Sequence, residues 1–469
     1  MQNKKVDVGE VIDSAGFIGK PLGIAVMMII IMLTDGFDLF VPGYVAPVLV
    51  DDWGISKADI QPFLQAGLIG MAVGSVLLGW IGDRIGRKKA YVSCLALMFI
   101  GSGFCYFAKT TTDLFVWRLV MGFGLGGITP LATTLVSEWT NRNVRAVVVA
   151  SVVVAIPMGG MLTGFVDRAL VPEYGWRSMF AVGAIVPLLL FILFSYLLPE
   201  SPKYLAQRPR LHKRLAKSLN QLVRENRFDG TEEFFVAEAG KRSSNWFFTI
   251  WNSDFRCRTT LIWIAFAVNS FVLYLFTSQI PLLLVQANMS RDIGSMGLQF
   301  FSGGAVLGSV GGAYLVGWYG SKNTGTALAA LGGVGIGLMA LLLTGGNTST
   351  HALFALFLVA GASVNGMQAF MYAVSAHSYP TEVRGSAVGM AQTFSRIGAV
   401  LSPTAAAIYF GMDPVPPVSA FLFFMAGVIC LTVISFYLIP THIPRSSQQA
   451  VEKEEDQAQR EGLGVAPPE

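Results

Sequence analysis

The chain has 469 residues, of which 53% are hydrophobic and only 13% are charged; its mean hydropathy is +0.57 and its formal net charge is +4. Soluble domains carry roughly a quarter charged residues, so this composition excludes an ordinary soluble protein and indicates an integral membrane protein. The four cysteines have the spacing of neither a metal site nor a disulfide framework.

The first apolar segment, residues 22–50, is long enough to cross a bilayer. It is too long for a signal peptide, so we expect it to persist as a helix. Eleven more apolar segments follow, at about 60–82, 90–108, 113–138, 145–167, 177–198, 258–285, 294–318, 325–344, 351–376, 386–410 and 417–439.

A polar stretch divides these twelve segments six and six. The sequence therefore predicts an all-α membrane protein with the following parts: an N-terminal tail 1–21, a six-helix bundle 22–198, a central loop 199–257, a second six-helix bundle 258–440, and a tail 441–469. The central loop is expected to be a linker with some helix. The composition of the last tail is typical of disorder.

Lysine and arginine are distributed unevenly over the connections. If both termini are cytoplasmic, the inner connections carry about four times as many of these residues as the outer ones, which is the bias that cytoplasmic loops show. The slightly basic net charge therefore reflects the inner membrane face and gives no evidence for nucleic-acid binding.

The two halves of the chain repeat one another. LLGWIGDR at 77–84 aligns with LVGWYGSK at 315–322, and Glu138 with Arg145 aligns with His377 and Arg384. Paired six-helix halves are the pattern of a transporter whose binding site lies between its repeats. The sequence thus predicts two pseudo-symmetric bundles.

The connection after the second segment reads GWIGDRIGRKK at residues 79–89. Its glycines permit a tight turn, and its basic residues favour the anionic inner leaflet. This stretch resembles the loop signature of the major facilitator superfamily, and together with the twelve segments the resemblance covers almost the whole chain. It implies a conformational latch in which Asp83 contacts the start of the eleventh helix and holds the outward-open state. The latch residues would be Asp83, Arg84, Gly86, Arg87 and Lys88; the simpler alternative is a positive-inside anchor.

Within this superfamily, DGFD at 35–38 is similar to the Asp-Gly-x-Asp motif of the aromatic acid:proton symporter family. FSRIGA at 394–399 strengthens the similarity, whereas LPESPKYL at 198–205 also resembles sugar porters. The resemblance implies proton-driven import of a small aromatic carboxylate by alternating access, in a monomer of the bacterial inner membrane. The proton gradient would be the energy source.

Four ionisable residues lie deep in apolar segments: Asp35, Asp38, Arg118 and Arg396. Each costs roughly 2.5 to 3.5 kcal/mol at the bilayer centre, so each needs a partner or a wet cavity. Asp35 and Asp38 share one helical face, and their mutual repulsion favours a bound proton. An ion pair with Arg118 would oppose that effect. We expect these three residues, with Glu138 at an inner helix end, to serve proton coupling or gating; the alternatives are structural ion pairs, for Glu138 with Arg142 or Arg145.

Arg396 lies near mid-membrane, and a planar guanidinium suits a carboxylate bidentately. We therefore expect it to bind the acid group of the substrate, with packing or an interhelical ion pair as the alternatives. An aromatic substrate also needs apolar walls and a few polar groups. Helical spacing predicts that Asn365, Gln368 and Tyr372 share one face, and that Ser270, Tyr274 and Thr277 share another. These faces could line the substrate cavity; the alternative for each side chain is interhelical hydrogen bonding or lipid-facing aromatic packing.

No nucleotide-binding loop, zinc ligand cluster or catalytic triad motif occurs in the sequence. We therefore expect a transporter without metal or cofactor, and not an enzyme. The alternatives are a porter for a sugar or another metabolite such as nicotinate, or a receptor or channel that retains the same bundle.

Overall fold

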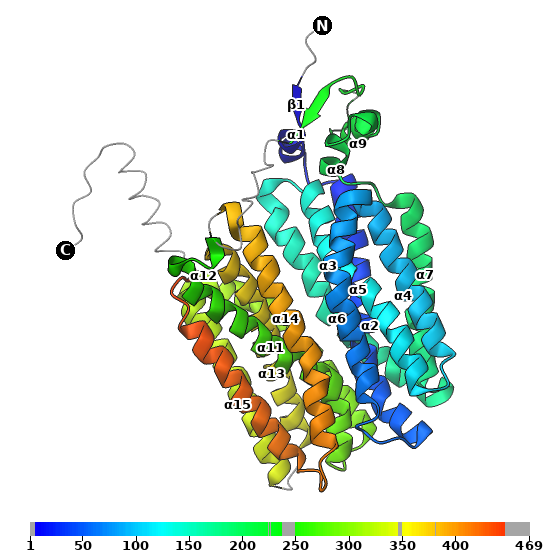
Figure 1. Cartoon of the computed structure of the whole chain (residues 1–469), viewed down its shortest axis with the longest axis vertical. Coiled ribbons are helices and arrows are strands. Elements are labelled where there is room, and N and C mark those ends of the chain that lie inside the picture. Colours follow the sequence, from blue (N-terminus) through cyan, green and yellow to red (C-terminus); the bar gives the residue numbers. More distant parts are fainter. Residues whose placement is uncertain are drawn as a thin grey trace, which may run out of the picture. The chain divides into compact units, whose positions relative to one another are not determined.

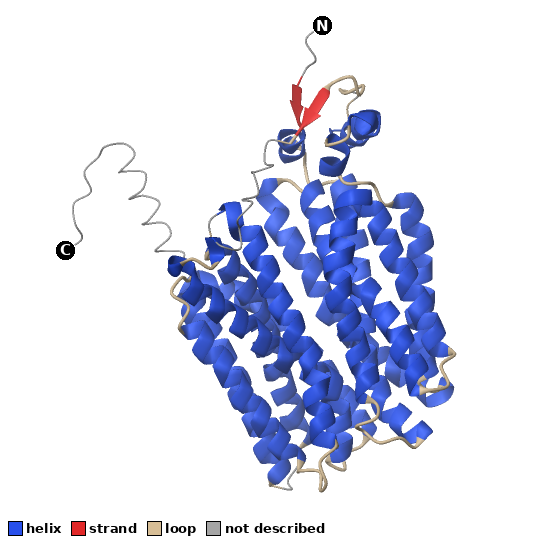
Figure 2. Ribbon diagram, in the orientation of Figure 1, coloured by secondary structure: helices blue, strands red, loops and turns tan. Residues whose placement is uncertain are grey.

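The computed structural model describes residues 5–223, 225, 227–236, 249–345, 349–379 and 381–445. Helices dominate this part of the chain (Figure 2). The expected disordered tail beyond Arg445 and residues 237–248 of the central loop lie outside the described residues.

Long helices occupy the positions of the predicted apolar segments (Figure 1). Those of the first half are α2 (Lys20–Trp53), α3 (Gln61–Ile85), α4 (Arg87–Tyr106), α5 (Thr111–Trp139), α6 (Arg142–Tyr174) and α7 (Arg177–Leu197). Those of the second half are α11 (Ser253–Gln286), α12 (Arg291–Thr344), α13 (Thr350–His377), α14 (Thr381–Phe410) and α15 (Val418–Tyr437).

Helix α12 contains two membrane spans, Arg291–Val316 and Trp318–Thr344, which meet at a kink where Gly320 has a φ of 75°. Within the described residues, eleven spans are long and apolar enough to cross a membrane, and α14 occupies the remaining predicted segment. The predicted all-α membrane fold is confirmed: each of the twelve predicted spans is helical.

Several helices extend past the apolar segments that predicted them. Helix α5 begins at a capping box, in which the Thr110 side chain and the Asp113 side chain each accept a backbone N–H of the other residue. Helix α2 has 34 residues, about 51 Å at 1.5 Å per residue, whereas the hydrocarbon layer is about 30 Å thick. Hydropathy therefore locates the spans but underestimates how far the helices extend beyond them.

The structure divides into two compact units that differ from the two sequence halves. Unit 1 comprises Met1–Lys241, Tyr274–Ser302 and Ala399–Pro416; unit 2 comprises Arg242–Leu273, Gly303–Gly398 and Pro417–Glu469. Unit 1 thus combines α2 to α7 with one end each of α11, α12 and α14.

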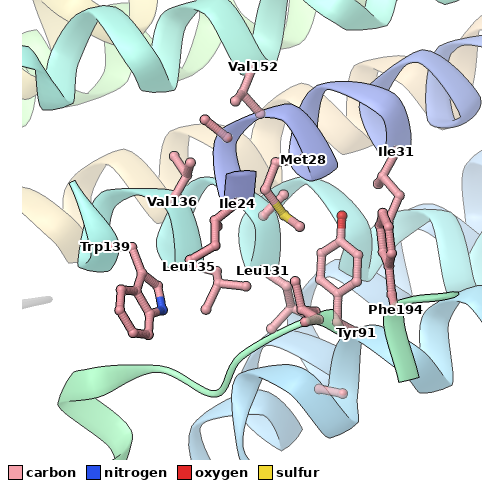
Figure 3. Close-up of a cluster of buried hydrophobic side chains, with 14 of the residues drawn as sticks. Ile24, Met28, Ile31, Tyr91, Leu131, Leu135, Val136, Trp139, Val152 and Phe194 are labelled. Atoms are coloured by element: carbon pink, nitrogen blue, oxygen red, sulfur yellow. The ribbon is translucent and has the colours of Figure 1, made fainter. Parts of the chain in front are cut away.

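In unit 1, α3 packs on α5, α2 on α6, and α4 on both α5 and α7. Large apolar side chains such as Met28, Tyr91 and Trp139 fill the space between α2, α4 and α5 (Figure 3). We call the end of unit 1 that carries the connections 84–89 and 140–145 the basic end, because six arginines and lysines lie there: Arg84, Arg87, Lys88, Lys89, Arg142 and Arg145.

Helices α2 and α6 approach each other at glycines. A Cβ on Gly36 would overlap the main-chain oxygen of Ile156, and a Cβ on Gly159 would overlap that of Leu33. Small residues allow such close backbone contact between membrane helices. Gly36 lies within the DGFD motif, so this contact fixes the position of the two aspartates beside it.

A small folded cap covers the basic end. Strand β1 (Lys5–Asp7) pairs in parallel with β2 (Glu233–Phe235), and α1 (Val8–Ser14) lies near α8 (Pro202–Ala206) and α9 (His212–Val223) (Figure 1). Leu215, Leu219 and Leu222 form the buried face of α9. The N-terminal tail and the central loop are therefore partly ordered against each other.

Unit 2 has its own apolar core, in which the ring of Trp263 on α11 stacks on Phe394 of α14 at 4.3 Å. The segment after α15 returns to the kink of α12. There the Ser321 amide donates to the Ile443 carbonyl at 2.9 Å, and the Ile443 amide donates to the Ser321 hydroxyl at 2.8 Å. Ser321 is the counterpart of Asp83 in the sequence repeat, so the two copies of this loop differ in their contacts.

Candidate functional site

The two aspartates of α2 are buried inside unit 1. Asp35 is 2% exposed and Asp38 is 1% exposed. The Thr129 hydroxyl of α5 donates to Oδ2 of Asp35 at 3.3 Å. Oδ2 of Asp38 is buried and accepts no hydrogen bond from the described residues. Two carboxyl groups three residues apart therefore have different surroundings.

Arg118 of α5 contacts α2 through the main chain. Its Nη2 donates to the carbonyl oxygen of Asp38 at 2.6 Å, and its Nη1 lies 3.1 Å from the sulfur of Met121. That carbonyl is available because residue 42, four positions later, is a proline and has no N–H to donate. The sequence left open whether Arg118 pairs with the aspartates; in the structure its guanidinium binds the backbone carbonyl of Asp38.

The Asp38 carboxyl group points toward α7, where Gly183 leaves space for it. A Cβ on Gly183 would lie 2.6 Å from Oδ1 of Asp38 and 2.6 Å from the Ser102 hydroxyl. Ser102 itself donates to the Phe180 carbonyl at 2.9 Å. A glycine at position 183 is therefore part of the aspartate site, although no sequence motif singled it out.

A narrow cavity of about 20 Å³ lies beside Arg118 in unit 1. Tyr274, Thr277 and Ser278 of α11 line it on one side, together with Pro42 of α2. This volume accommodates about one water molecule, whereas drug-sized ligands need roughly 300 Å³ or more. The cavity thus brings the predicted substrate residue Tyr274 near the predicted coupling residue Arg118, but it does not hold an aromatic acid.

A charge network links three helices at the basic end. Arg87 at the start of α4 contacts the Asp83 carboxylate of α3, and its Nη2 lies 3.2 Å from Oε1 of Glu138 on α5. Glu138 is buried, whereas the Asp83 side chain is 62% exposed. Glu138 is therefore joined to the predicted latch residues through Arg87, a contact that the sequence analysis did not foresee.

The remaining latch residues shape the turn between α3 and α4. Gly86 has a φ of 106°, which only glycine adopts readily, and Glu200 occupies the space where its Cβ would be. Oε1 of Glu200 accepts the Lys88 amide at 3.1 Å, which places a carboxylate at the N-terminus of α4. The Arg84 guanidinium stacks on Trp80 at 3.8 Å. Glu200 was missed because its partner lies 112 residues away.

In unit 2, Gln368 of α13 is the centre of a buried polar cluster. Its Oε1 accepts Nδ2 of Asn269 at 2.8 Å and lies 3.4 Å from the Ser270 hydroxyl, which is 2.5 Å from the Ser395 hydroxyl. Asn269 and Ser395 were not predicted. Ser395 immediately precedes Arg396, which is partly buried on α14.

The other two predicted substrate residues of α13 lie in different surroundings. Nδ2 of Asn365 donates to the Gly361 carbonyl of its own helix at 3.2 Å. The Tyr372 and Phe266 rings form an edge-to-face pair with centroids 5.1 Å apart. Gln368 thus joins a polar cluster that links three helices, whereas Tyr372 contributes to an aromatic wall.

A fourth buried carboxylate of unit 1, besides Asp35, Asp38 and Glu138, was not predicted from the sequence. Asp167 of α6 accepts Nη2 of Arg291 at 2.6 Å and the Ser295 hydroxyl at 2.9 Å, both from α12. It falls at the edge of the predicted segment 145–167, where a charge is easily assigned to a loop.

Comparisons with known proteins agree with this architecture. The family model described as Major Facilitator Superfamily matches residues 28–403 and again residues 326–465. The 4-hydroxybenzoate transporter PcaK of Acinetobacter baylyi is 30% identical over 418 residues, which cover 87% of this chain and 89% of the relative. The gallate transporter of Pseudomonas putida is 31% identical over 396 residues, 84% of this chain and 87% of the relative.

Among solved structures, the D-xylose–proton symporter matches with a TM-score of 0.67 and 18% sequence identity. The match covers 91% of this chain and 98% of that protein. The relatives are named as transporters, so the prediction of a transporter rather than an enzyme is confirmed.

Proposed function

The chain belongs to the Major Facilitator Superfamily, and from this premise we propose that it imports a small aromatic carboxylate together with protons, by alternating access of its two halves. The relatives named above transport 4-hydroxybenzoate and gallate, and both compounds are aromatic carboxylates. The proton gradient supplies the energy, and no cofactor takes part.

Proton coupling rests on one observation above all, the surroundings of Asp38. A carboxylate that is buried with an oxygen lacking any donor among the described residues carries a large desolvation cost. A bound proton removes that cost. Because Arg118 is engaged with the Asp38 carbonyl, it can hold the helix in place in both protonation states. Asp35 and Glu138 join the coupling and gating set as further buried carboxyl groups.

Recognition of the substrate is assigned to Arg396 and the polar cluster of unit 2. Arg396 lies fifteen residues after the first residue of α14, about 22 Å along the helix axis and hence near its middle. A guanidinium at that depth can pair bidentately with a carboxylate. Gln368 and Asn365 supply polar groups, and Tyr372 and Tyr274 supply aromatic surface.

We further propose that the basic end faces the cytoplasm. Arginine and lysine gather there, as expected for the cytoplasmic side of a bacterial inner membrane. Both chain termini then lie inside the cell, and the protein acts as a monomer. The Asp83, Arg87 and Glu138 network would in this orientation serve as the inner latch, with Arg84, Gly86 and Lys88 shaping its turn.

Uptake by purified protein in proteoliposomes tests the function. An inward proton gradient should drive accumulation of radiolabelled 4-hydroxybenzoate, and unlabelled benzoates should compete while sugars do not. Phenylpropanoates and nicotinate in the same panel define the width of the substrate class. Accumulation of a sugar instead, or flux that ignores the gradient, would contradict the proposal.

A further inference from the structure

Asp167 and Arg291 form a buried ion pair at the end of unit 1 opposite the basic end. The Asp167 side chain is 2% exposed and that of Arg291 is 30% exposed, with 2.6 Å between Oδ1 and Nη2. Ser295 donates to the other carboxylate oxygen at 2.9 Å. Asp167 lies on α6 in the first sequence half, and its two partners lie on α12 in the second. The pair therefore connects the two repeats.

The packing around this pair is tight. Nε2 of Gln299 donates to the Met161 carbonyl at 3.2 Å, and a Cβ on Gly164 would overlap the Gln299 side chain. The Tyr44 hydroxyl of α2 donates to the Gly160 carbonyl at 3.4 Å. Backbone and side chains of α2, α6 and α12 thus pack closely beside the pair.

Other charged and titratable groups near Asp167 lie on the same three helices. Asp292 adjoins Arg291 and is exposed, Arg168 follows Asp167, and the Tyr44 phenol on α2 is near enough to interact electrostatically with both α6 residues. Arg168 places its guanidinium over the Phe165 ring at 5.5 Å. Arg291 is accordingly the cation that directly contacts the Asp167 carboxylate.

We propose that Asp167 and Arg291 form the outer gate, and that the separated pair binds one proton and one substrate carboxylate. This rests on the proposed function, because import requires the outer end to open. Opening leaves a carboxylate on α6 and a guanidinium on α12, each without its partner. A proton on Asp167 and an organic carboxylate on Arg291 replace both lost charges, so the total charge balances. The two species that open the gate are then those that the protein carries.

The gate can be tested by chemical labelling without any substrate. Ser302 is fully buried on α12 and faces Gly160 of α6. Ser302→Cys, in a protein whose four native cysteines are replaced, reports opening through its reaction with a membrane-impermeant maleimide added from outside. Asp167→Asn and Arg291→Gln should each raise the labelling rate about tenfold or more, because the closed state loses its ion pair.

Matched controls remove neighbouring charges that the gate does not use. Asp292→Asn and Arg168→Gln should label at the parent rate. The exchange Asp167→Arg with Arg291→Asp restores an ion pair of reversed polarity and should return labelling toward the parent rate, which separates loss of the pair from misfolding. Labelling that stays at the parent rate in both single variants would overturn the gate.

The response of the labelling rate to protons and to a carboxylate tests whether the separated pair binds both. Low pH and added 4-hydroxybenzoate should each increase the labelling rate of the parent. Each rate is divided by that of Asp167→Asn at the same pH, so that the effect of pH on the reactivity of the thiol itself cancels. 4-Hydroxybenzamide should have no effect on the labelling rate, and labelling of Arg291→Gln should no longer respond to 4-hydroxybenzoate. Equal effects of 4-hydroxybenzoate and 4-hydroxybenzamide on the labelling rate would overturn the proposed carboxylate site. If the parent does not transport 4-hydroxybenzoate at all, the proposed function fails while the charge-dependent gate still stands on the labelling data.

Discussion

Two residues shape the surroundings of Asp38 because each lacks a group that most residues have. Pro42 has no N–H, so the Asp38 carbonyl is left for Arg118. Gly183 has no side chain, so the Asp38 carboxyl group has space beside α7. The result is a buried acid whose Oδ2 has no donor among the described residues, next to a guanidinium that binds the carbonyl of the same residue.

Replacing either aspartate of α2 with asparagine removes a proton-binding group while keeping its size. We expect Asp38→Asn to abolish uptake driven by a pH gradient and Asp35→Asn to reduce it severely, with the folded protein retained in the membrane. Exchange of labelled for unlabelled substrate should survive, because it needs no net proton movement. Full gradient-driven accumulation by both variants would refute a coupling role.

Arg396 allows a test of the substrate charge. Arg396→Lys keeps the positive charge but loses the two-pronged geometry, so it should weaken binding strongly, and Arg396→Ala should abolish it. Loss of a buried charge-assisted pair costs about 2 to 5 kcal/mol, or roughly thirtyfold to several thousandfold in affinity. Calorimetry on the purified protein measures this. If Arg396→Ala binds the substrate as the parent does, the Arg396 guanidinium has a structural role and Arg118 is the next candidate for binding the carboxylate.

At the scale of helices, proline and glycine decide where α2 can touch its neighbours. Pro42 and Pro47 both lie inside this helix, and each leaves one carbonyl without its usual intrahelical donor. Gly36 allows the backbone of α2 to reach α6. The position of the aspartates is therefore a property of the helix pair and not of the DGFD motif alone.

Pro42→Ala should restore the intrahelical bond to the Asp38 carbonyl and compete with Arg118 for that oxygen. A buried guanidinium that loses an acceptor is costly, so initial rates of coupled uptake should fall about tenfold although α2 becomes more regular. Pro47→Ala, in the same helix, adds an N–H donor for the carbonyl four residues earlier, at Gly43, which Arg118 does not use, and it serves as the control. Equal rates for the two variants would argue against the Arg118 contact.

Gly36→Ala should destabilise the α2–α6 contact, because its methyl group would overlap the Ile156 main-chain oxygen. Overpacking of this kind costs typically 1 to 3 kcal/mol, which a lower midpoint of thermal unfolding would report. Gly23→Ala in the same helix meets nothing within 4 Å, and it should leave the midpoint unchanged or raise it slightly. A midpoint of Gly36→Ala equal to that of Gly23→Ala would contradict the close approach.

At the scale of the whole molecule, hydropathy alone predicted the helices and their number, because a bilayer needs a long apolar run for every span. It did not predict contacts between distant residues. Strand β1 pairs with a strand 228 positions later, and Glu200 caps a helix that begins 113 positions earlier. Neither partner has a local signal.

The site residues likewise divide into those that the sequence predicted and those that only the structure identified. Asp35, Asp38 and Arg118 were found because a charge inside an apolar run is conspicuous. Asn269 and Ser395 are uncharged and do not stand out in an apolar segment, and Asp167 lies at a segment edge, so none of the three was predicted. The proline four residues after Asp38 was a readable signal for a free carbonyl, but the donor that uses it could be identified only from the structure.

Substrate-driven proton movement tests proton-coupled import most directly. Proteoliposomes containing a pH-sensitive dye, with equal pH on both sides, receive 4-hydroxybenzoate outside. Proton-coupled import predicts rapid acidification of the interior by the parent protein, well above that of protein-free liposomes and of liposomes containing Asp38→Asn. Substrate entry without acidification above these two controls would contradict proton-coupled import.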